Sequence, residues 1–213
     1  MKNKLNQFCR SNRTMLINFT IVWASLFVFE CIYPKLQTHL MLNGYHTPVM
    51  DTIFKYITVL GEGFPTYFGI LLLIWSRRYG LFILLSQGLT FIITQILKFA
   101  FAHPRPATYF EQMGADLPDT VPGVSLRRAM NSFPSGHTSA AFAFFTCLAL
   151  MTPRKWAPLW MTAGWAVAYS RIYLSQHFLE DILLGSVIGM ISTCVMYILM
   201  NQYFTKKNLK LFN

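Results

Sequence analysis

Six apolar segments recur along the chain, and each approaches the roughly 20 residues that a helix needs to cross a bilayer. Only 12% of the residues are charged, whereas roughly a quarter would be normal in a soluble domain. The sequence therefore predicts an all-α, polytopic membrane protein in which residues 1–213 form one domain, a bundle of six transmembrane helices. The expected spans are about residues 15–33, 61–76, 79–101, 135–152, 156–173 and 182–202.

Charged residues predict how this bundle is oriented. If the N-terminus is cytoplasmic, eleven of the eighteen Lys and Arg residues fall on inner segments and all eight acidic residues fall on the outer face. The positive-inside rule then places both termini in the cytoplasm of a multi-pass protein of the inner (plasma) membrane. The inner cations are Lys2, Lys4, Arg10, Arg13, Arg77, Arg78, Arg154, Lys155, Lys206, Lys207 and Lys210.

The outer face carries two long connections, residues 34–63 and 102–134. The first contains MDTIFKYITVLGE, whose apolar residues suit a helix that lies at the membrane surface. The second is rich in Pro, Gly and charge, and it joins two clusters of polar residues, which favours a functional loop. In the sixth span, Gly185 and Gly189 form a GxxxG pair that is typical of a close helix contact.

Composition excludes two other kinds of site. The net charge of +10 could attract nucleic acid, but the bases are dispersed between apolar segments, so we expect no nucleic-acid partner. The four cysteines, Cys9, Cys31, Cys147 and Cys194, have no CxxC spacing and mostly lie in or beside apolar segments. They are interpreted as small buried hydrophobic residues, and no metal site or disulfide framework is expected.

Three polar clusters reach the outer face in this arrangement. They contain Lys98, Arg105 and Pro106; then Pro134, Ser135, Gly136 and His137; then Ser170, Arg171, His177 and Asp181. Three cations near hydrocarbon need a partner, and a phosphate suits the forked guanidinium groups of arginine. Backbone N–H groups at a helix start, at Ser135 and Gly136, would also favour an anion. The clusters together predict a phosphoryl site.

Two histidines supply the groups for bond breaking. If the segment from His177 to Asp181 is helical, these two residues share a face. The carboxylate can then orient one ring nitrogen of His177 while the other attacks. His137 can donate a proton to the leaving oxygen. In the outer loop, Arg127 and Arg128 are either a solvated surface or a contact to an anionic head group.

The three clusters also resemble the three-part signature of the type 2 phosphatidic acid phosphatase superfamily. The matching pattern is Lys98 to Arg105-Pro106, Pro134-Ser135-Gly136-His137, and Ser170-Arg171 to His177 and Asp181, with the same order and internal spacing. It spans residues 98–181, and the six-span layout extends the resemblance to nearly the whole chain.

The resemblance implies a lipid phosphatase that needs neither metal nor cofactor. His177 would be the nucleophile that forms a phosphohistidine, Asp181 would orient it, and His137 would be the general acid. Phosphoryl oxygens would be held by Lys98, Arg105, Ser135, Gly136 and Arg171, with Ser170 and Pro106 in support.

An outward-facing site implies a membrane lipid phosphate as substrate. Lipid A phosphate is the first expectation, and undecaprenyl pyrophosphate and phosphatidylglycerol phosphate are the alternatives. Transfer of the phosphoryl group to a second lipid is a further alternative to hydrolysis. An anion transporter is the alternative from another class, although its polar residues should run through the membrane instead of gathering at one face.

Overall fold

The computed structural model describes the backbone of residues 2–206 and the side chains of residues 6–203. Lys207 and Lys210, two of the expected inner cations, lie outside the described residues. Every regular element among the described residues is a helix, which confirms the all-α fold.

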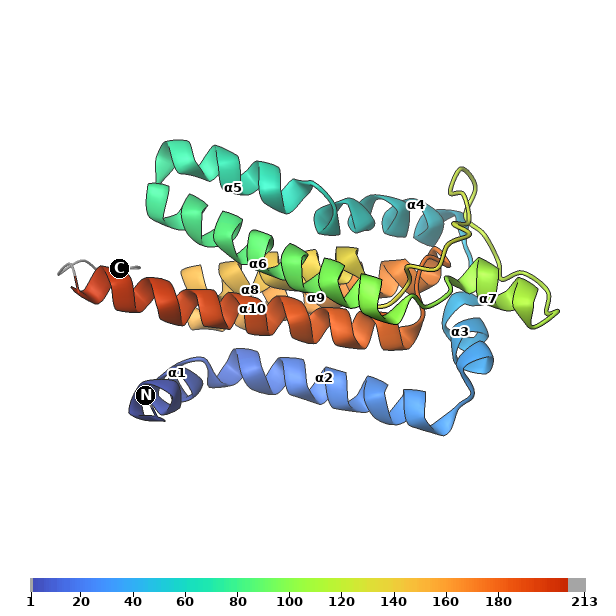
Figure 1. Cartoon of the computed structure of the whole chain (residues 1–213), viewed down its shortest axis with the longest axis horizontal. Coiled ribbons are helices and arrows are strands. Elements are labelled where there is room, and N and C mark those ends of the chain that lie inside the picture. Colours follow the sequence, from blue (N-terminus) through green and yellow to red (C-terminus); the bar gives the residue numbers. More distant parts are fainter. Residues whose placement is uncertain (1, 207–213) are drawn as a thin grey trace.

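Six helices occupy the six expected ranges and run along the long axis of the molecule (Figure 1). They are α2 (Arg13–Ile32), α5 (Phe64–Trp75), α6 (Arg77–Phe101), α8 (Gly136–Met151), α9 (Ala157–Tyr173) and α10 (Leu179–Lys206). At one end lie α1 (Lys2–Ser11) and the last turns of α10; α3 (Lys35–Asn43), α4 (Pro48–Ile57) and α7 (Pro106–Gln112) lie at the other (Figure 1). Short 3-10 helices complete the chain at η1 (Thr58–Gly61) and η2 (Arg154–Trp156).

Length and composition qualify three helical segments as membrane spans: Arg13–Ile32, Arg77–Gln112 and Leu179–Tyr203. A fourth results if Pro48–Gly61 and Phe64–Trp75, which meet at a bend of 53°, form one broken span. The second span therefore does not begin as a helix at Gly61, because the chain breaks there before α5 starts at Phe64. Helices α8 and α9 have 16 and 17 residues, so they are shorter than a full crossing.

Helix α8 forms the centre of the bundle, where it contacts α6, α9 and α10. Its side chains alternate between small and aromatic residues, and ten of its sixteen residues are buried. The ring of Phe142 packs edge-on against Phe19 of α2 and Trp165 of α9, with centroids 5.5 and 4.8 Å apart. Because α8 is packed on several sides, the residues at its first turn have a fixed position.

Two glycines let α10 approach α8 closely. A Cβ atom on Gly189 would lie 2.2 Å from the backbone oxygen of Ser139, and one on Gly185 would lie 2.8 Å from that of Ser135. Neither oxygen can move without moving α8. This confirms the close helix contact that the GxxxG pair indicates.

We expect Gly189→Val to destabilise the protein by about 3 kcal/mol, because the added atoms overlap backbone that cannot relax. Thermal unfolding of the purified chain in detergent measures the effect. Gly88→Ala is the matched control, since a Cβ atom at Gly88 would meet nothing within 4 Å. Equal melting temperatures for the two variants would contradict the close contact.

Candidate active site

His177 and Asp181 form a buried pair at the start of α10. Nδ1 of His177 lies 3.2 Å from Oδ2 of Asp181, and the two side chains are 2% and 0% exposed. The same carboxylate oxygen accepts hydrogen bonds from the hydroxyl of Ser132 at 2.5 Å and from the backbone N–H of Phe178 at 2.8 Å. Asp181 is therefore held by three donors, and it fixes Nδ1 of His177. Among the described residues, the side chains that contact the His177 ring by hydrogen bonding, Asp181 and Ser132, both do so at Nδ1.

The pair is not formed as the sequence predicted. His177 lies outside α10, which begins at Leu179, so the two residues do not share a helical face. A turn positions His177 instead: Ser175 has a φ of 49°, and the N–H groups of Gln176 and His177 both donate to the carbonyl of Arg171. The four-residue spacing still brings the side chains together, because the first turn of α10 directs Asp181 back toward the preceding loop.

Arg105 and Lys98 both converge on the segment that carries Ser132. The guanidinium of Arg105 donates from Nε to Oδ1 of Asn131 at 2.8 Å and from Nη1 to the carbonyl of Gln176 at 3.1 Å. The ammonium of Lys98 donates to the carbonyl of Asn131 at 2.5 Å and that of Ser132 at 3.4 Å. Arginine has five N–H donors and lysine three, so each keeps donors for an anion.

Arg171 provides a third buried cation, whereas Ser170 and Pro106, the two supporting residues of the signature, make structural contacts only. The guanidinium of Arg171 is 4% exposed and donates from Nη1 to Oγ1 of Thr58 at 2.6 Å, while Nε has no partner among the described residues. Ser170 donates to the carbonyl of Val167 in its own helix at 2.6 Å. Pro106 is buried as the first residue of α7. Arg171 thus retains an unpartnered donor for an anion, whereas Ser170 and Pro106 stabilise local backbone.

The start of α8 corrects one expectation. The backbone N–H of Ser135 donates to the carbonyl of Asp181 at 3.0 Å, so the expectation that this amide is available to an anion is wrong. The hydroxyl of Ser135 accepts from Oγ1 of Thr138 at 3.0 Å and from its backbone N–H at 3.4 Å. Its own hydrogen remains available, so Ser135 can still donate from its side chain. Gly136 follows as the first residue of α8.

A groove of about 470 Å³ opens beside His137, between α6, α8 and the break before α5. Gly136 and His137 line it, whereas His177, Asp181 and Ser132 do not. A Cβ atom on Gly61 would lie 2.5 Å from the backbone oxygen of His137, so the break packs directly on the first turn of α8. His137 therefore borders this groove, whereas the buried pair does not.

Arg127 and Arg128 differ in their surroundings, although both are exposed. Nε of Arg128 forms an ion pair with Glu111 at 2.7 Å. Two hydrogen bonds hold the backbone on either side of Arg127. The side-chain amide of Gln176 donates to the carbonyl of Ser125 at 3.1 Å, and the backbone N–H of Arg105 donates to the carbonyl of Ala129 at 2.9 Å. The positive charge of Arg127 also acts on the guanidinium of Arg105.

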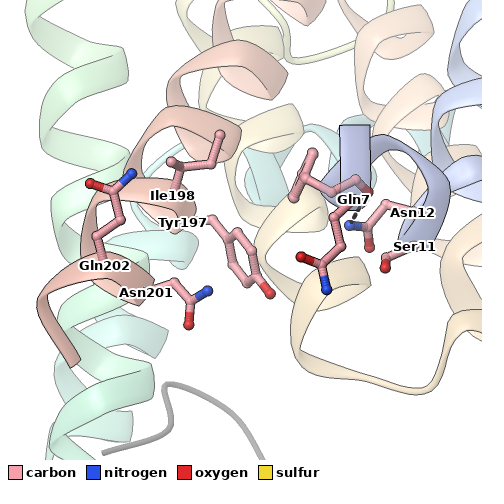
Figure 2. A pocket seen from close by; sticks show the side chains of 8 residues that line it. Gln7, Ser11, Asn12, Tyr197, Ile198, Asn201 and Gln202 are labelled. Carbon is pink, nitrogen blue, oxygen red and sulfur yellow. Dashed lines mark hydrogen bonds between the residues drawn. The ribbon is translucent and has the colours of Figure 1, made fainter. Parts of the chain in front are cut away.

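A second pocket, of about 260 Å³, lies at the opposite end of the bundle between α1 and α10. Figure 2 shows Gln7 and Asn12 on one side and Tyr197 and Asn201 on the other. None of the residues that line it is Lys, Arg, His, Asp or Glu. This pocket has no group for phosphoryl chemistry, so the candidate active site is the one at the start of α8 and α10.

Burial holds the pKa of His177 well below its usual range, and the positive charges of Arg105, Arg171 and Lys98 lower it further. A lowered pKa keeps the imidazole neutral at neutral pH, which is the form that has a lone pair on Nε2. The surrounding cations therefore favour a nucleophilic histidine as well as an anionic ligand.

Loss of one cation should move the pH profile in a defined direction. In Arg105→Gln, the pKa of His177 rises, because the charge that opposes its protonation most strongly is gone. We expect the acid inflection of kcat/KM to move to higher pH, whereas the ionisation of the substrate contributes equally to both profiles. Arg128→Gln, whose guanidinium is paired with Glu111, should keep the wild-type inflection. An inflection that stays or moves down in Arg105→Gln would contradict this electrostatic coupling.

Sequence reasoning missed the polar residues that hold the predicted ones, namely Ser132, Asn131, Thr58 and Gln176. Ser132 and Asn131 lie just before the Pro134–His137 cluster, and Gln176 lies next to His177. Proximity to these clusters is the one signal that could have indicated Ser132, Asn131 and Gln176. Thr58 lies 113 residues from Arg171 and carries no such signal.

Comparison with known proteins gives a consistent picture. The family model described as "PAP2 superfamily" matches residues 79–205. The lipid A 1-phosphatase of Rhizobium johnstonii is 30% identical over 54% of this chain and 44% of its own length. The lipid A 4'-phosphatase of Porphyromonas gingivalis is 30% identical over 71% of this chain and 66% of its own length. The undecaprenyl-diphosphatase BcrC of Bacillus subtilis is 27% identical over 70% of this chain and 74% of its own length. The chain thus spans less than two thirds of the two lipid A phosphatases.

Two crystal structures share the fold. The structure of Aquifex aeolicus LpxE superposes with a TM-score of 0.67 at 24% identity, and covers 78% of this chain and 97% of that protein. The transmembrane PAP2-type phosphatidylglycerolphosphate phosphatase of Bacillus subtilis superposes with a TM-score of 0.61 at 21% identity, and covers 90% of this chain and 96% of that protein.

Proposed function

Because the chain belongs to the PAP2 superfamily, we propose that it is a membrane lipid phosphatase that hydrolyses a phosphomonoester or pyrophosphate of a membrane lipid without a metal ion. One observation supports this most strongly: the buried His177, held at Nδ1 by Asp181, lies among Lys98, Arg105 and Arg171. A fixed nucleophile beside several cations suits attack on a phosphoryl group.

The first step is transfer of the phosphoryl group to His177. The lone pair on Nε2 attacks phosphorus, and the bond between phosphorus and the lipid oxygen breaks. Asp181 stabilises the positive charge that develops on the imidazole through its contact with Nδ1. The phosphoryl oxygens would be bound by Lys98, Arg105, Arg171, the hydroxyl of Ser135 and the backbone of Gly136, with Arg127 as a further head-group contact.

The leaving oxygen takes a proton from the imidazolium of His137, which faces the groove. Water then attacks the phosphorus of the phosphohistidine and gives its proton to the neutral His137. The P–N bond breaks, inorganic phosphate leaves, and both histidines return to their starting forms. His177 and His137 thus each act in both steps of the reaction.

We propose lipid A phosphate as the first substrate, because two of the relatives reported above are lipid A phosphatases. Undecaprenyl pyrophosphate and phosphatidylglycerol phosphate are the alternatives, in line with the two Bacillus subtilis proteins. The distribution of charge supports an inner membrane protein with cytoplasmic termini and an outward-facing site. A reporter fused near Asp116 should then lie on the outer side, and a cytoplasmic signal would overturn the orientation.

One assay tests the reaction. The purified chain in detergent should release inorganic phosphate from at least one of the three lipids in the presence of EDTA, and lipid A should give the highest rate. Activity that depends wholly on added divalent metal would overturn the mechanism. Appearance of the phosphoryl group on a second lipid would identify a phosphotransferase, and anion uptake into vesicles without hydrolysis would identify a transporter.

A further inference from the structure

The groove beside His137 is where the leaving group must lie, if the proposed function holds. In a displacement at phosphorus, the leaving group departs on the side opposite the nucleophile, and the general acid must reach its oxygen. His137 lines the groove and His177 does not. The remaining lining residues therefore surround the part of the lipid that departs.

The groove opens toward the bilayer side of the bundle. Phe91, on α6, is 63% exposed, and Gly88 and Thr66 are exposed as well. All three belong to helices that occupy expected membrane spans, so their exposed surface faces lipid. A leaving group with an acyl or prenyl anchor can therefore remain in the membrane while its oxygen reaches His137.

Charge along the groove is unusual for a site that handles phosphate. Among the residues that line it, none is Lys or Arg, and the one carboxylate is that of Glu62. Glu62 is exposed, and its negative charge acts on Arg171, although within the described part of the chain its carboxylate forms no ion pair or hydrogen bond at contact distance. The cations Lys98, Arg105 and Arg171 instead surround the phosphoryl site, outside this lining.

The uncharged polar lining suits hydrogen bonds to a neutral group. Amides are provided by Gln87 and Gln95, and hydroxyls by Thr66, Thr90 and Thr94. The hydroxyls of Thr90 and Thr94 are buried without a partner among the described residues. Gln87 already donates to the carbonyl of Ala140 at 3.0 Å, which fixes its position between α6 and α8.

The two substrate classes differ in the charge of the leaving group. A phosphomonoester releases an alcohol, which is neutral once His137 has protonated it. A diphosphate releases a lipid monophosphate, which carries a charge of about −1.5 to −2 at neutral pH. A second anion in the groove would be repelled by Glu62, and no lysine or arginine of the lining would compensate for it.

We propose that Glu62 is a specificity-determining residue that selects lipid phosphomonoesters with an uncharged, hydroxyl-bearing leaving group against lipid diphosphates. The selection acts through repulsion of the wrong leaving group, while the amides and hydroxyls of the groove accommodate the correct one. This rests on the proposed phosphatase function, and it favours the monoesters among the candidate substrates.

A matched pair of lipids tests the selection. Phosphatidic acid and diacylglycerol pyrophosphate with identical acyl chains differ by one phosphate. Removal of the terminal phosphate therefore releases a neutral alcohol from the first lipid and a lipid monophosphate from the second. Initial rates are measured in mixed detergent micelles, with the terminal phosphate labelled so that only the first cleavage is counted. We expect the wild-type chain to have the higher kcat/KM on phosphatidic acid.

Substitution of Glu62 should then reduce this preference. Glu62→Gln removes the charge at nearly constant shape, and we expect the ratio of the two kcat/KM values to fall about tenfold, the size of one like-charge contact near a protein surface. Glu62→Lys should lower the ratio further, through a gain on the diphosphate. Asp116→Asn, which removes an exposed charge of the outer loop away from the groove, should leave the ratio unchanged.

Each other outcome has one meaning. A wild-type preference for the diphosphate, or a ratio that Glu62→Gln does not change, overturns the selection while leaving the phosphatase function intact. Release from neither lipid of the pair, with activity on lipid A, also overturns it, because the proposed class includes the diacylglycerol alcohol. Failure to release phosphate from any lipid tested would overturn the phosphatase function itself.

Discussion

His177→Ala is expected to reduce phosphate release by at least ~10⁴-fold, because it removes the atom that forms the covalent bond to phosphorus. The substitution should leave the fold intact. Asp181 keeps its hydrogen bonds from Ser132 and from the backbone of Phe178, so its carboxylate does not lose every donor when the imidazole is removed. The measurement is release of inorganic phosphate from the best lipid substrate in the presence of EDTA.

A covalent intermediate gives this prediction a second readout. Rapid denaturation of the wild-type chain during turnover of a labelled substrate should trap label on the protein, in the acid-labile form expected of a P–N bond, and His177→Ala should trap none. His103→Ala is the matched control, because the side chain of His103 is 41% exposed and lies outside the pair. Near-normal phosphate release from His177→Ala would remove the phosphohistidine from the mechanism.

The positions of the long helices could be predicted well from hydropathy. Helices α6 and α9 begin within about two residues of the expected limits, because a long apolar segment in lipid must satisfy its backbone groups as a helix. The short helices α1, α3 and α7 were not predicted. They lie at the ends of the bundle, and the contacts of α3 with α2 and α9 come from tertiary packing and not from a pattern along the chain.

The break before α5 shows a different limit. The sequence predicted a second span from about residue 61 and a surface helix before it, whereas the structure has two helical segments, Pro48–Gly61 and Phe64–Trp75, that meet at a bend of 53°. Gly61 at this break packs on the backbone of His137, and nothing in the local sequence indicates that contact. The break creates one wall of the groove, so the groove and the position of Glu62 could not be predicted from the sequence.

Spacing along the chain predicted the candidate site residues, and long-range contacts decide how they are held. His177 and Asp181 are four residues apart, whereas Ser132 is 49 residues from the carboxylate to which it donates. The occupied backbone amide of Ser135 is a similar case, because its acceptor is the carbonyl of Asp181 on another helix. A helix start alone predicts unpaired N–H groups, and only the packing of α8 against α10 shows which of them is used.

The second large effect concerns His137 and depends on the leaving group. If His137 protonates the departing oxygen, His137→Ala should lower kcat/KM for an alkyl lipid phosphate by about 10²–10⁴-fold, because kcat/KM reports the steps up to departure of the leaving group. The same variant should lose less than about tenfold in kcat/KM on p-nitrophenyl phosphate, whose phenolate departs without a proton, while kcat falls for both substrates because the later attack of water on the phosphohistidine also uses His137. The backbone oxygen of His137, against which Gly61 packs, is retained in the variant, so the groove keeps its wall.

The comparison between substrates separates this role from a structural one. A variant that only misplaces the phosphoryl group would lose activity equally on the lipid and on p-nitrophenyl phosphate, as we expect for His177→Ala. Equal losses in His137→Ala would therefore assign His137 to binding and leave the general acid to another group. A loss confined to the lipid would place the proton donor in the groove, on the side from which the leaving group departs and where Glu62 lies.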